Sequence, residues 1–489
     1  MMLPEKFVER VLRDLGPEEG RTLCEALESE APTSVRLHPA KCPAKCPAMG
    51  PAKSLSERLS EGPSGSAEAF AGGFPETLPN LTPARRVPWC REGWYLAGRP
   101  SFTFDPDFHA GAYYVQEASS QFVGRLLSGC NFEGARLLDL CAAPGGKTTL
   151  YASLVGPQGL VVANEIDRRR AAVLADNVRK WGTGNVVVTC CEAAALGDFE
   201  AWFDVVAVDA PCSGEGMFRK DPAARGEWSE ANVRLCAARQ DGILREAWRA
   251  LKPGGTLVYS TCTFNRDEDE GSLERMLAWT GEEVSEAAPV DVEASWGVVC
   301  GRVGAFRTFR FYPHRACGEG FFAAVACKSA ESGDRVRTPK ARRTVLAPVD
   351  RKSASELARW LQDPGGMRFG VAGDTSYAWP AAQAEAVQTL SGALPVIYSG
   401  VALGTIFKGV LKPDPALAFF TGLDRGALPV AELADEEAVR YLRRQEIAAA
   451  GLAEGMNLVC VRGRGLGFAK RIGNRVNNLY PNSLRIMKQ

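Results

Sequence analysis

Short apolar runs that alternate with helical patterns occupy the middle of the chain. The five runs are Leu137–Leu140, GLVVANEID, Asn185–Thr189, FDVVAVDAPCSGEGMF and GGTLVYSTCTFNRDEDE. Such runs are typical of strands buried on both faces, and helical patterns between them favour parallel pairing. The pattern therefore predicts an α/β domain with a mainly parallel sheet.

The regions on either side of these runs carry weaker patterns. Helical spacing of apolar residues between Leu3 and Glu30 predicts two short amphipathic helices. Val87–Phe108 carries WC, GWYL and FTFD, which favour short strands, and Tyr113–Leu127 favours a helix that leads into the sheet. Arg307–Lys328 is expected to form two strands joined by a loop, as the last antiparallel strands of the sheet.

The C-terminal third has a different pattern. Ser329–Lys352 is a charged connector, and Ala354–Leu361 has helical spacing. Short β-like pieces punctuated by glycine follow, including ALPVIYSGVALGTIF and NLVCVRG. Together they predict a small β-rich or α+β domain.

One stretch near the N-terminus is low in complexity. Pro39–Leu81 contains KCPAKCPAMGPAK, followed by sequence rich in Ser, Gly and Glu, which is typical of a flexible insertion. Cys42 and Cys46 lack the second ligand pair that zinc needs, so no metal is expected. The expected domains are an N-terminal extension over 1–130 with the insertion at 39–81, a catalytic domain over 131–328, a linker over 329–352 and a C-terminal domain over 353–489.

Composition narrows the class of protein. A chain of 489 residues that is 46% hydrophobic has material for roughly two to four domains with their own cores. Fifteen cysteines in a chain of this length suit a reducing compartment better than a secreted disulfide scaffold. No apolar run has membrane-spanning length, and the N-terminus lacks a signal-peptide layout. We expect a soluble, cytoplasmic protein, with a monomer as the default.

The formal net charge is zero, but the charge is unevenly distributed. The last 27 residues contain six basic side chains and no acid. The basic residues are Arg464, Lys470, Arg471, Arg475, Arg485 and Lys488. Phe468, Tyr480 and several asparagines lie among them, and phosphate pairing with base stacking uses such groups. This tail therefore indicates RNA contact rather than only a solvated face.

A glycine turn follows the first apolar run. Cys141-Ala142-Ala143-Pro144-Gly145-Gly146-Lys147 reads as a strand end, a tight turn and a helix start. Glycine lets the backbone approach a ligand, and a helix N-terminus offers unpaired amide donors. The second run ends on Glu165 and Asp167, at a place where an acid suits a ribose diol.

Two cysteines follow later strands. Cys212 comes after Asp209-Ala210-Pro211, and Cys262 comes after Ser260-Thr261. Since ligands of parallel sheets bind beyond the carboxyl ends of the strands, these thiols and the glycine turn are expected at one rim. A thiolate that adds to C6 of a pyrimidine makes C5 nucleophilic towards a methyl sulfonium, and a second group assists release. Asp209 is placed to hydrogen-bond the cytosine edge.

Three blocks carry a family resemblance. CAAPGGK (Cys141–Lys147), DAPCSGEGMF (Asp209–Phe218) and STCTF (Ser260–Phe264) resemble the signature blocks of the Nol/Nop/Sun-type RNA cytosine-5 methyltransferases. PWC-x-x-G-WYL and YYVQEASS resemble the N-terminal region of that family. The ending GRGLGFAKRIGNRVNNLYPNSLR resembles the C-terminal RNA-binding domain of its bacterial small-subunit rRNA methyltransferase F subgroup.

The resemblance implies a Rossmann-like catalytic domain that uses S-adenosylmethionine, an RNA-binding N-terminal extension, and a small α+β, PUA-like RNA-binding domain at the C-terminus. It implies a cofactor site formed by Cys141, Ala142, Ala143, Pro144, Gly145, Gly146, Lys147, Glu165, Glu192 and Asp209. It also implies Cys262 as the nucleophile and Cys212 as the cysteine that assists product release. From the residues alone the two thiols stay unranked, since DNA cytosine-5 methyltransferases use the cysteine of a Pro-Cys pair.

The favoured function is methylation of C5 of cytosine in small-subunit (16S) rRNA through a covalent cysteine adduct. RNA is the expected partner, and neither DNA nor a membrane is. One alternative keeps this chemistry and changes the substrate to tRNA. The other is a ribosome-assembly factor that binds RNA without catalysis.

Overall fold

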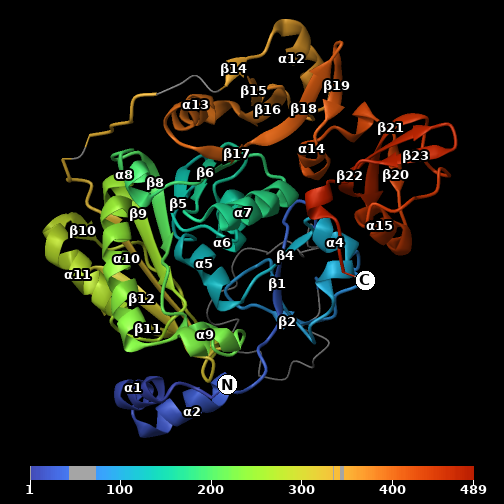
Figure 1. Ribbon diagram of the computed structural model, residues 1–489. Coiled ribbons are helices and arrows are strands. Elements are labelled where there is room, and N and C mark those ends of the chain that lie inside the picture. Colours follow the sequence, from blue (N-terminus) through green and yellow to red (C-terminus); the bar gives the residue numbers. More distant parts are fainter. Residues whose placement is uncertain (1, 43–72, 334, 342–345, 489) are drawn as a thin grey trace, which may run out of the picture.

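A large mixed sheet forms the centre of the molecule (Figure 1). The computed structural model describes residues 2–42, 73–333, 335–341 and 346–488. The sheet has ten strands, in the order β11-β12-β13-β9-β8-β5-β6-β7-β17, with β10 paired to β13. Its five parallel strands are β5 (Arg136–Asp139), β6 (Leu160–Asn164), β7 (Val186–Thr189), β8 (Phe203–Asp209) and β9 (Leu251–Thr261). They confirm the five strands predicted from the apolar runs.

Antiparallel strands extend this sheet on both sides. The strands beyond β9 are β10 (Val284–Ser285), β11 (Val299–Val303), β12 (Phe306–Phe311) and β13 (Phe321–Lys328). The last two confirm the antiparallel pair predicted within Arg307–Lys328. On the opposite edge β17 (Val396–Ser399) pairs with β7, although it comes from the predicted C-terminal domain.

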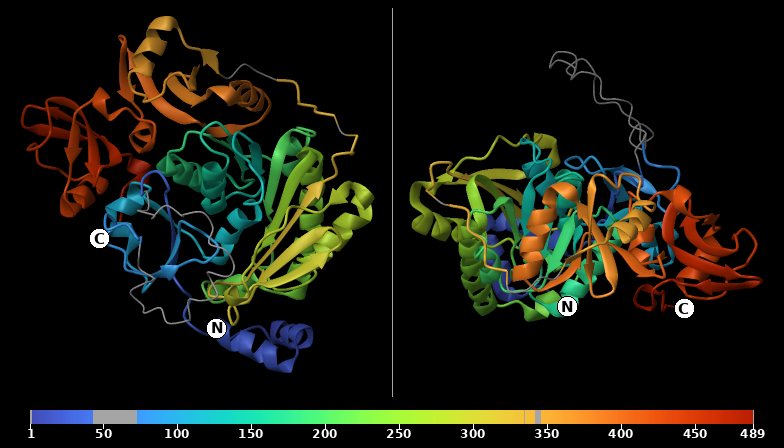
Figure 2. Two further views of the ribbon diagram at one scale, coloured as in Figure 1. Left: turned by 180° about the vertical axis from the view of Figure 1, so that it is seen from behind. Right: turned by 90° about the horizontal axis from the view of Figure 1, so that it is seen from above.

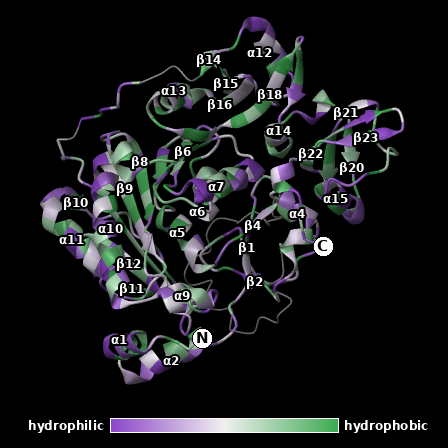
Figure 3. Ribbon diagram, in the orientation of Figure 1, coloured by the Kyte–Doolittle hydropathy of each residue, from purple (hydrophilic) through white to green (hydrophobic). Residues whose placement is uncertain are grey.

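Both faces of the sheet are buried. Neighbouring residues of one strand, such as Leu137 and Leu138, belong to two different hydrophobic clusters on opposite faces. Figure 3 shows the apolar residues gathered on these strands. Helices α6 (Gly146–Leu154) and α7 (Arg168–Trp181) cover one face, and α10 (Glu230–Ala250) and α11 (Glu270–Thr280) cover the other. No helix among the described residues is long and apolar enough to cross a membrane.

The N-terminal region combines a helical hairpin with a small sheet. The predicted helices are α1 (Glu5–Leu15) and α2 (Pro17–Leu27), which confirms that expectation. The antiparallel sheet has the order β2-β3-β1-β4 and contains β1 (Ser34–Leu37), β2 (Pro83–Arg86), β3 (Gly93–Leu96) and β4 (Tyr113–Val115).

Three local expectations for this region were wrong. The strand expected at WC is absent, because Trp89 and Cys90 lie in the turn between β2 and β3. The helix predicted over Tyr113–Leu127 is instead strand β4, a 3-10 turn (Ser119–Phe122) and the short helix α5 (Val123–Leu126). Pairing of Tyr113–Val115 with β1 overrides the helical spacing, because aromatic and β-branched side chains suit a half-buried sheet. The FTFD segment is a 3-10 turn over Phe102–Phe104, and Asp105 then caps α4 (Pro106–His109).

The flexible insertion predicted over 39–81 is wrong at its two margins. Most of it, 43–72, lies outside the described residues, as does Cys46. At its margins Cys42, Leu78 and Leu81 are buried in a cluster with Trp94. These margins are therefore part of the packed N-terminal region.

The C-terminal region contains two small sheets. The first has the order β14-β15-β16-β18-β19, and the second has the order β20-β21-β22-β23. The strands of the first are β14 (Ala347–Pro348), β15 (Met367–Ala372), β16 (Thr375–Pro380), β18 (Val401–Phe407) and β19 (Val410–Pro413). Those of the second are β20 (Val430–Glu432), β21 (Gly455–Val461), β22 (Arg464–Ile472) and β23 (Arg475–Asn478). The accompanying helices are α12 (Arg351–Ala358), α13 (Ala384–Ala393), α14 (Pro415–Phe419) and α15 (Asp435–Leu442).

A buried ion-pair cluster joins the last sheet to the N-terminal region, and the two lie side by side in both views (Figures 1 and 2). The carboxylate of Asp107 is fully buried and binds Arg462 at 2.6 Å and Arg464 at 2.7 Å. Arg464 also donates to the carbonyl of Lys41 and to the hydroxyl of Thr77. Arg464 is thus a structural residue, which corrects its assignment to an RNA-contacting tail.

Removal of the shared carboxylate tests this junction. We expect Asp107→Ala to lower the free energy of unfolding by about 3–5 kcal/mol, because two partly buried guanidinium groups lose their counter-charge. Thermal unfolding measures the effect, with the exposed Glu274→Ala on α11 as control. Equal midpoints for both variants would contradict the role of the cluster.

Candidate active site

The predicted glycine turn lies at the carboxyl end of β5. Gly145 has φ of +110°, a conformation that side chains with a Cβ rarely adopt, and α6 begins at the next residue. The carbonyl of Pro144 accepts hydrogen bonds from Asn177 Nδ2 at 2.8 Å and Tyr114 Oη at 3.2 Å. The turn is therefore held between α7 and the N-terminal sheet.

A cavity of about 410 Å³ opens in front of this turn. Eight predicted site residues line it, namely Cys141, Ala142, Ala143, Pro144, Gly146, Lys147, Asp209 and Cys262. The other lining residues come from β4 and the segment after it, from the end of β5, from the segment after β8, and from the start of β13 and the residues before it. They include Tyr114, Gln116, Glu117, Met217, Lys220, Glu319 and Phe321.

A lysine and an aspartate form the charged pair of the cavity. Lys147 Nζ lies 2.8 Å from Asp209 Oδ2, and the Ser260 hydroxyl donates to Asp209 Oδ1 at 2.8 Å. Burial lowers the pKa of Lys147, but the charge and hydrogen bond of Asp209 and the charge of a Cys262 thiolate outweigh it, so this pKa is raised overall. Lys147 is therefore a fixed positive charge beside the site.

The two cysteines meet at this rim. Cys212 Sγ and Cys262 Sγ are 3.3 Å apart, and the backbone N–H of Cys262 donates to Cys212 Sγ at 3.4 Å. Both cysteines are half-buried, and of the two Cys262 lines the cavity. A hydrogen bond in which the Cys212 thiol donates to Cys262 Sγ, together with burial, raises the pKa of Cys212 well above its ordinary value. Cys212 is thus held as a neutral thiol beside Cys262.

Glu165 and Glu192 lie outside this cavity lining. Glu165 follows β6 and is 3% exposed; it accepts the backbone N–H of Asp167 at 3.0 Å and pairs with Arg170 at 3.4 Å. Glu192 precedes α8 (Ala193–Gly197), and its side chain is exposed. Their assignments to the cofactor remain predictions, as does that of Gly145.

Asp139 was missed by sequence reasoning. It ends β5, is 1% exposed and lines the cavity. Its Oδ2 accepts the Thr148 hydroxyl at 2.6 Å, while its Oδ1 is buried without a hydrogen-bond partner in the described part of the chain. Burial raises the pKa of Asp139 to about 7. The sequence contained one signal for this residue, namely an acidic side chain within the apolar run Leu137–Leu140.

The basic C-terminal segment differs from expectation in its aromatic residues. Phe468 and Tyr480 are 2% and 0% exposed, so neither is available for base stacking. Arg471 donates to the backbone carbonyls of Leu452 and Gly473. Lys470, Arg475, Arg485 and Lys488 are exposed. The exposed charge of the segment is therefore smaller than its composition suggests.

Comparison with known proteins agrees with this architecture. A family model described as 16S rRNA methyltransferase RsmB/F matches residues 131–326. The N-terminal domain of 16S rRNA methyltransferase RsmF matches 72–118, and the methyltransferase RsmF PUA domain matches 429–486. The last range corresponds to the sheet β20–β23.

Relatives and solved structures agree as well. The ribosomal RNA small subunit methyltransferase F of Shewanella loihica is 32% identical over 81% of this chain and 83% of its own. The protein of that name from Erwinia tasmaniensis is 31% identical over 83% and 85%. A crystal structure of a methyltransferase homologue from Pyrococcus horikoshii is 26% identical, with a TM-score of 0.50 over 66% of this chain and 95% of its own. The crystal structure of NSun6 from the same organism with SFG shares the fold, at 20% identity and a TM-score of 0.50 over 66% and 98%.

The sheet, the glycine turn and these matches define an S-adenosylmethionine-dependent methyltransferase. Within that class, the chain belongs to the ribosomal RNA small subunit methyltransferase F family. The predicted fold class, family and cofactor are thereby confirmed.

The residues of the cavity fit this cofactor. Its methionine end carries an ammonium and a carboxylate. The unpartnered Oδ1 of Asp139 would be a suitable acceptor for the ammonium. The first amides of α6 offer donors to the carboxylate. When bound, S-adenosylmethionine supplies an electrophilic methyl group.

The raised pKa of Asp139 predicts pH-dependent cofactor binding. Below pH 7 the carboxyl is largely protonated and must lose its proton to bind an ammonium. An α-amino group titrates near pH 7.7–8.0, so the amino group of the ligand stays mostly protonated up to about pH 7.5. We expect affinity to rise between pH 5.5 and about 7.5, as measured by calorimetry. Asp139→Asn should weaken binding and flatten the profile, and an unchanged profile would contradict this assignment.

Proposed function

We propose that this protein methylates C5 of a cytosine in small-subunit rRNA through a covalent adduct with Cys262. The observation that carries the proposal is the pair of thiols, 3.3 Å apart, at the cavity that also holds the glycine turn and the Lys147–Asp209 pair. A methyltransferase that acts on a more nucleophilic atom needs neither thiol.

The chemistry follows from the weak nucleophilicity of C5. The Cys262 thiolate adds to C6 of the cytosine, and the electrons of the C5–C6 double bond become available at C5. C5 would then take the methyl group from the sulfonium, whose carbon–sulfur bond breaks so that the sulfur leaves as a neutral thioether. Loss of the C5 proton to a base restores the double bond as the C6–S bond breaks, which frees Cys262.

The site suits these steps in three ways. The positive charge of Lys147 and the negative charge of a Cys262 thiolate attract each other. The Asp209 carboxylate is placed to accept a hydrogen bond from the amino edge of cytosine. The neutral thiol of Cys212 lies within hydrogen-bond distance of Cys262 Sγ, where it stabilises the sulfur that leaves C6. This arrangement supports Cys262 as the nucleophile and Cys212 as the residue that assists release.

RNA is the proposed substrate because of family membership and the PUA-type unit. The target base must be unstacked to reach Cys262, at a cost of a few kcal/mol in a duplex and less in a loop. Bisulfite sequencing of rRNA and tRNA from cells that lack the protein tests the substrate. Loss of a modified cytosine only in tRNA would favour the tRNA alternative.

The two cysteines should give opposite results in an adduct assay. Cys262→Ala removes the atom that bonds to C6, so no covalent RNA–protein complex should form. Cys212→Ala leaves addition intact but slows release, so the complex should accumulate. Denaturing gels with labelled small-subunit rRNA measure both.

Cys236→Ala, a buried cysteine on α10 away from the cavity lining, is the matched control and should behave as wild type. The reverse pattern would make Cys212 the nucleophile. Methyl transfer by Cys262→Ala at the wild-type rate would rule out a mechanism through a covalent Cys262 adduct.

The exposed basic residues of the C-terminal segment should contribute to RNA affinity. Replacement of Lys470 and Arg475 by alanine should weaken binding and reduce the salt dependence of log K by about 0.7–0.9 for each phosphate that the protein no longer neutralises. Filter binding from low to high salt measures this slope. A wild-type slope in the double variant would indicate that this face is only solvated.

A further inference from the structure

The N-terminal helical hairpin, α1 and α2, packs against the loops after β8 and β9, which carry the two cysteines. In Figure 1 the hairpin lies next to α9 (Pro222–Glu227). Phe7 of α1 is fully buried, and its ring packs edge-on against Phe218 at 5.0 Å and Trp228 at 5.9 Å. It also lies 6.4 Å from Phe264. Phe218 belongs to the loop that carries Cys212, and Phe264 to the loop that carries Cys262. One hairpin side chain therefore contacts both loops.

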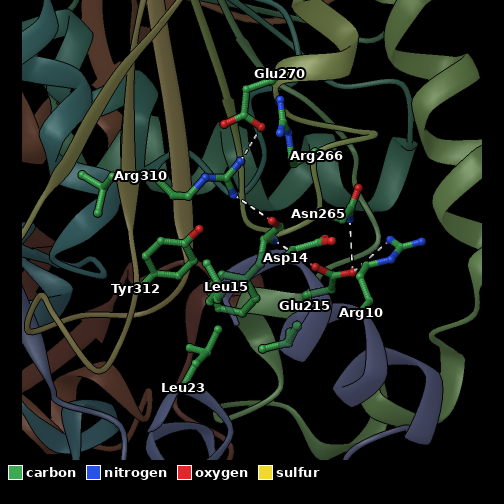
Figure 4. Close-up of a pocket in the computed structure, with 13 residues that line it drawn as sticks. Arg10, Asp14, Leu15, Leu23, Glu215, Asn265, Arg266, Glu270, Arg310 and Tyr312 are labelled. Atoms are coloured by element: carbon green, nitrogen blue, oxygen red, sulfur yellow. Dashed lines mark hydrogen bonds and ion pairs between the residues drawn. The ribbon is translucent and has the colours of Figure 1, made fainter. Parts of the chain in front are cut away.

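A second hairpin side chain, Arg10, is aimed at the polar side of the same loops (Figure 4). Its Nη1 lies 3.9 Å from Glu215 Oε1, and its Nη2 lies 3.6 Å from Asp267 Oδ2. The Arg10 side chain is 12% exposed and the Glu215 side chain 1%. Since the pair is withdrawn from water, its attraction is screened little by salt.

Glu215 ties the two loops together. Its Oε2 accepts the backbone N–H of Phe264 at 2.9 Å. Its Oε1 accepts Trp228 Nε1 at 2.9 Å and Asn265 Nδ2 at 3.2 Å. All of these are donors, so the site requires a side chain with two acceptor oxygens.

A second buried carboxylate completes the link. Glu268 Oε2 accepts the backbone N–H of Ser213 at 2.9 Å, and Glu268 Oε1 accepts Asn265 Nδ2 at 2.8 Å. Ser213 and Thr263, the residues after the two cysteines, hydrogen-bond through their hydroxyls at 3.0 Å. Each cysteine is thus directly followed along the chain by a residue that this network holds.

Further contacts hold the hairpin in place. Arg225 pairs with Glu28 at 2.9 Å and donates to the carbonyl of Leu27 at 3.1 Å. At the other side, Glu19 of α2 binds His314 at 3.2 Å and Arg315 at 2.6 Å. Arg225 lies in α9 (Pro222–Glu227), within the segment that follows β8, and His314 and Arg315 lie in the loop between β12 and β13. The hairpin therefore spans the loops around the thiols.

We propose that the hairpin is a positioning element for the two-cysteine site. Arg10 and Phe7 act through Glu215 and Phe264 to set the separation of Cys212 from Cys262. The inference rests on the proposed function, which assigns both thiols to the reaction. Since neither thiol lies in a strand, their separation depends on contacts made by loops.

The central test is a double-mutant cycle with Arg10→Ala and Glu215→Gln. Glutamine keeps the shape of Glu215 but turns one acceptor into an N–H donor that faces other donors. We expect each variant to lower kcat by about tenfold or more, because reacting groups misplaced by 1 Å lose up to about 10²-fold in rate. The KM for S-adenosylmethionine should change by less than about twofold, since its cavity does not include Arg10 or Glu215. The double variant should lose less than the product of the two effects.

A second readout reports the thiols without RNA or cofactor. A bifunctional thiol reagent of bimane type bridges two sulfurs that lie a few ångströms apart, and peptide mapping by mass spectrometry identifies the Cys212–Cys262 bridge. The bridging rate should fall with Arg10→Ala and Glu215→Gln and recover in part with Arg10→Lys. Arg21→Ala, on an exposed position of α2, should leave the rate and kcat unchanged.

Three outcomes are distinguishable. Wild-type kcat and bridging in Arg10→Ala and Glu215→Gln, with Cys262→Ala inactive, would overturn the positioning role and leave the proposed function intact. Activity in Cys262→Ala would overturn the proposed function, while a reduced bridging rate would still support the positioning role. A lowered kcat with wild-type bridging and additive effects would also overturn the inference, because Arg10 would then act by another route.

Discussion

The register between β8 and β9 is the constraint on which the site depends. In these parallel strands Asp209 pairs with Ser260, so the loops that follow the two strands leave the sheet at neighbouring positions of its carboxyl edge. Cys212 follows three residues after the first and Cys262 two residues after the second, which brings their sulfurs to 3.3 Å. A shift of one residue in this pairing would turn the alternating side chains to the other face and separate the thiols. The same hydrogen-bonded pair, Ser260 and Asp209, also orients the carboxylate towards Lys147.

Strands alone do not hold the loops beyond their ends. That task falls to buried polar groups, above all Glu215 and Glu268, which accept hydrogen bonds from both loops. Glu268 is fully buried, and this burial raises its pKa. Such groups are expensive to leave unpaired, so the network is satisfied in few loop conformations. Phe7 adds apolar contacts with aromatic residues of the same loops, so the hairpin packs directly on the catalytic domain.

The C-terminal region shows how one chain combines separate RNA-binding and catalytic units. The sheet β20–β23 matches the PUA model of the family and is joined to the N-terminal region through Asp107. The preceding unit contributes β17 to the edge of the catalytic sheet, next to β7. An unpaired edge strand can pair with another chain, and β17 prevents this at β7 by occupying its free side. Both a strand and a buried ion pair thus attach the C-terminal units to the rest of the molecule.

Much of the catalytic domain was determined by local sequence. Continuous apolar runs specify buried strands, and parallel pairing places their carboxyl ends at one rim, so the glycine turn, Asp209 and both cysteines could be assigned to one site. Other features were decided only by tertiary structure. These are the choice of Cys262 as the thiol that faces the cavity, the burial of Phe468, Tyr480 and Arg464, and the contact of Phe7 with loops more than 200 residues away. The physical reason is that periodicity reports which side of an element is buried, whereas the identity of the partner depends on packing between segments distant in the chain.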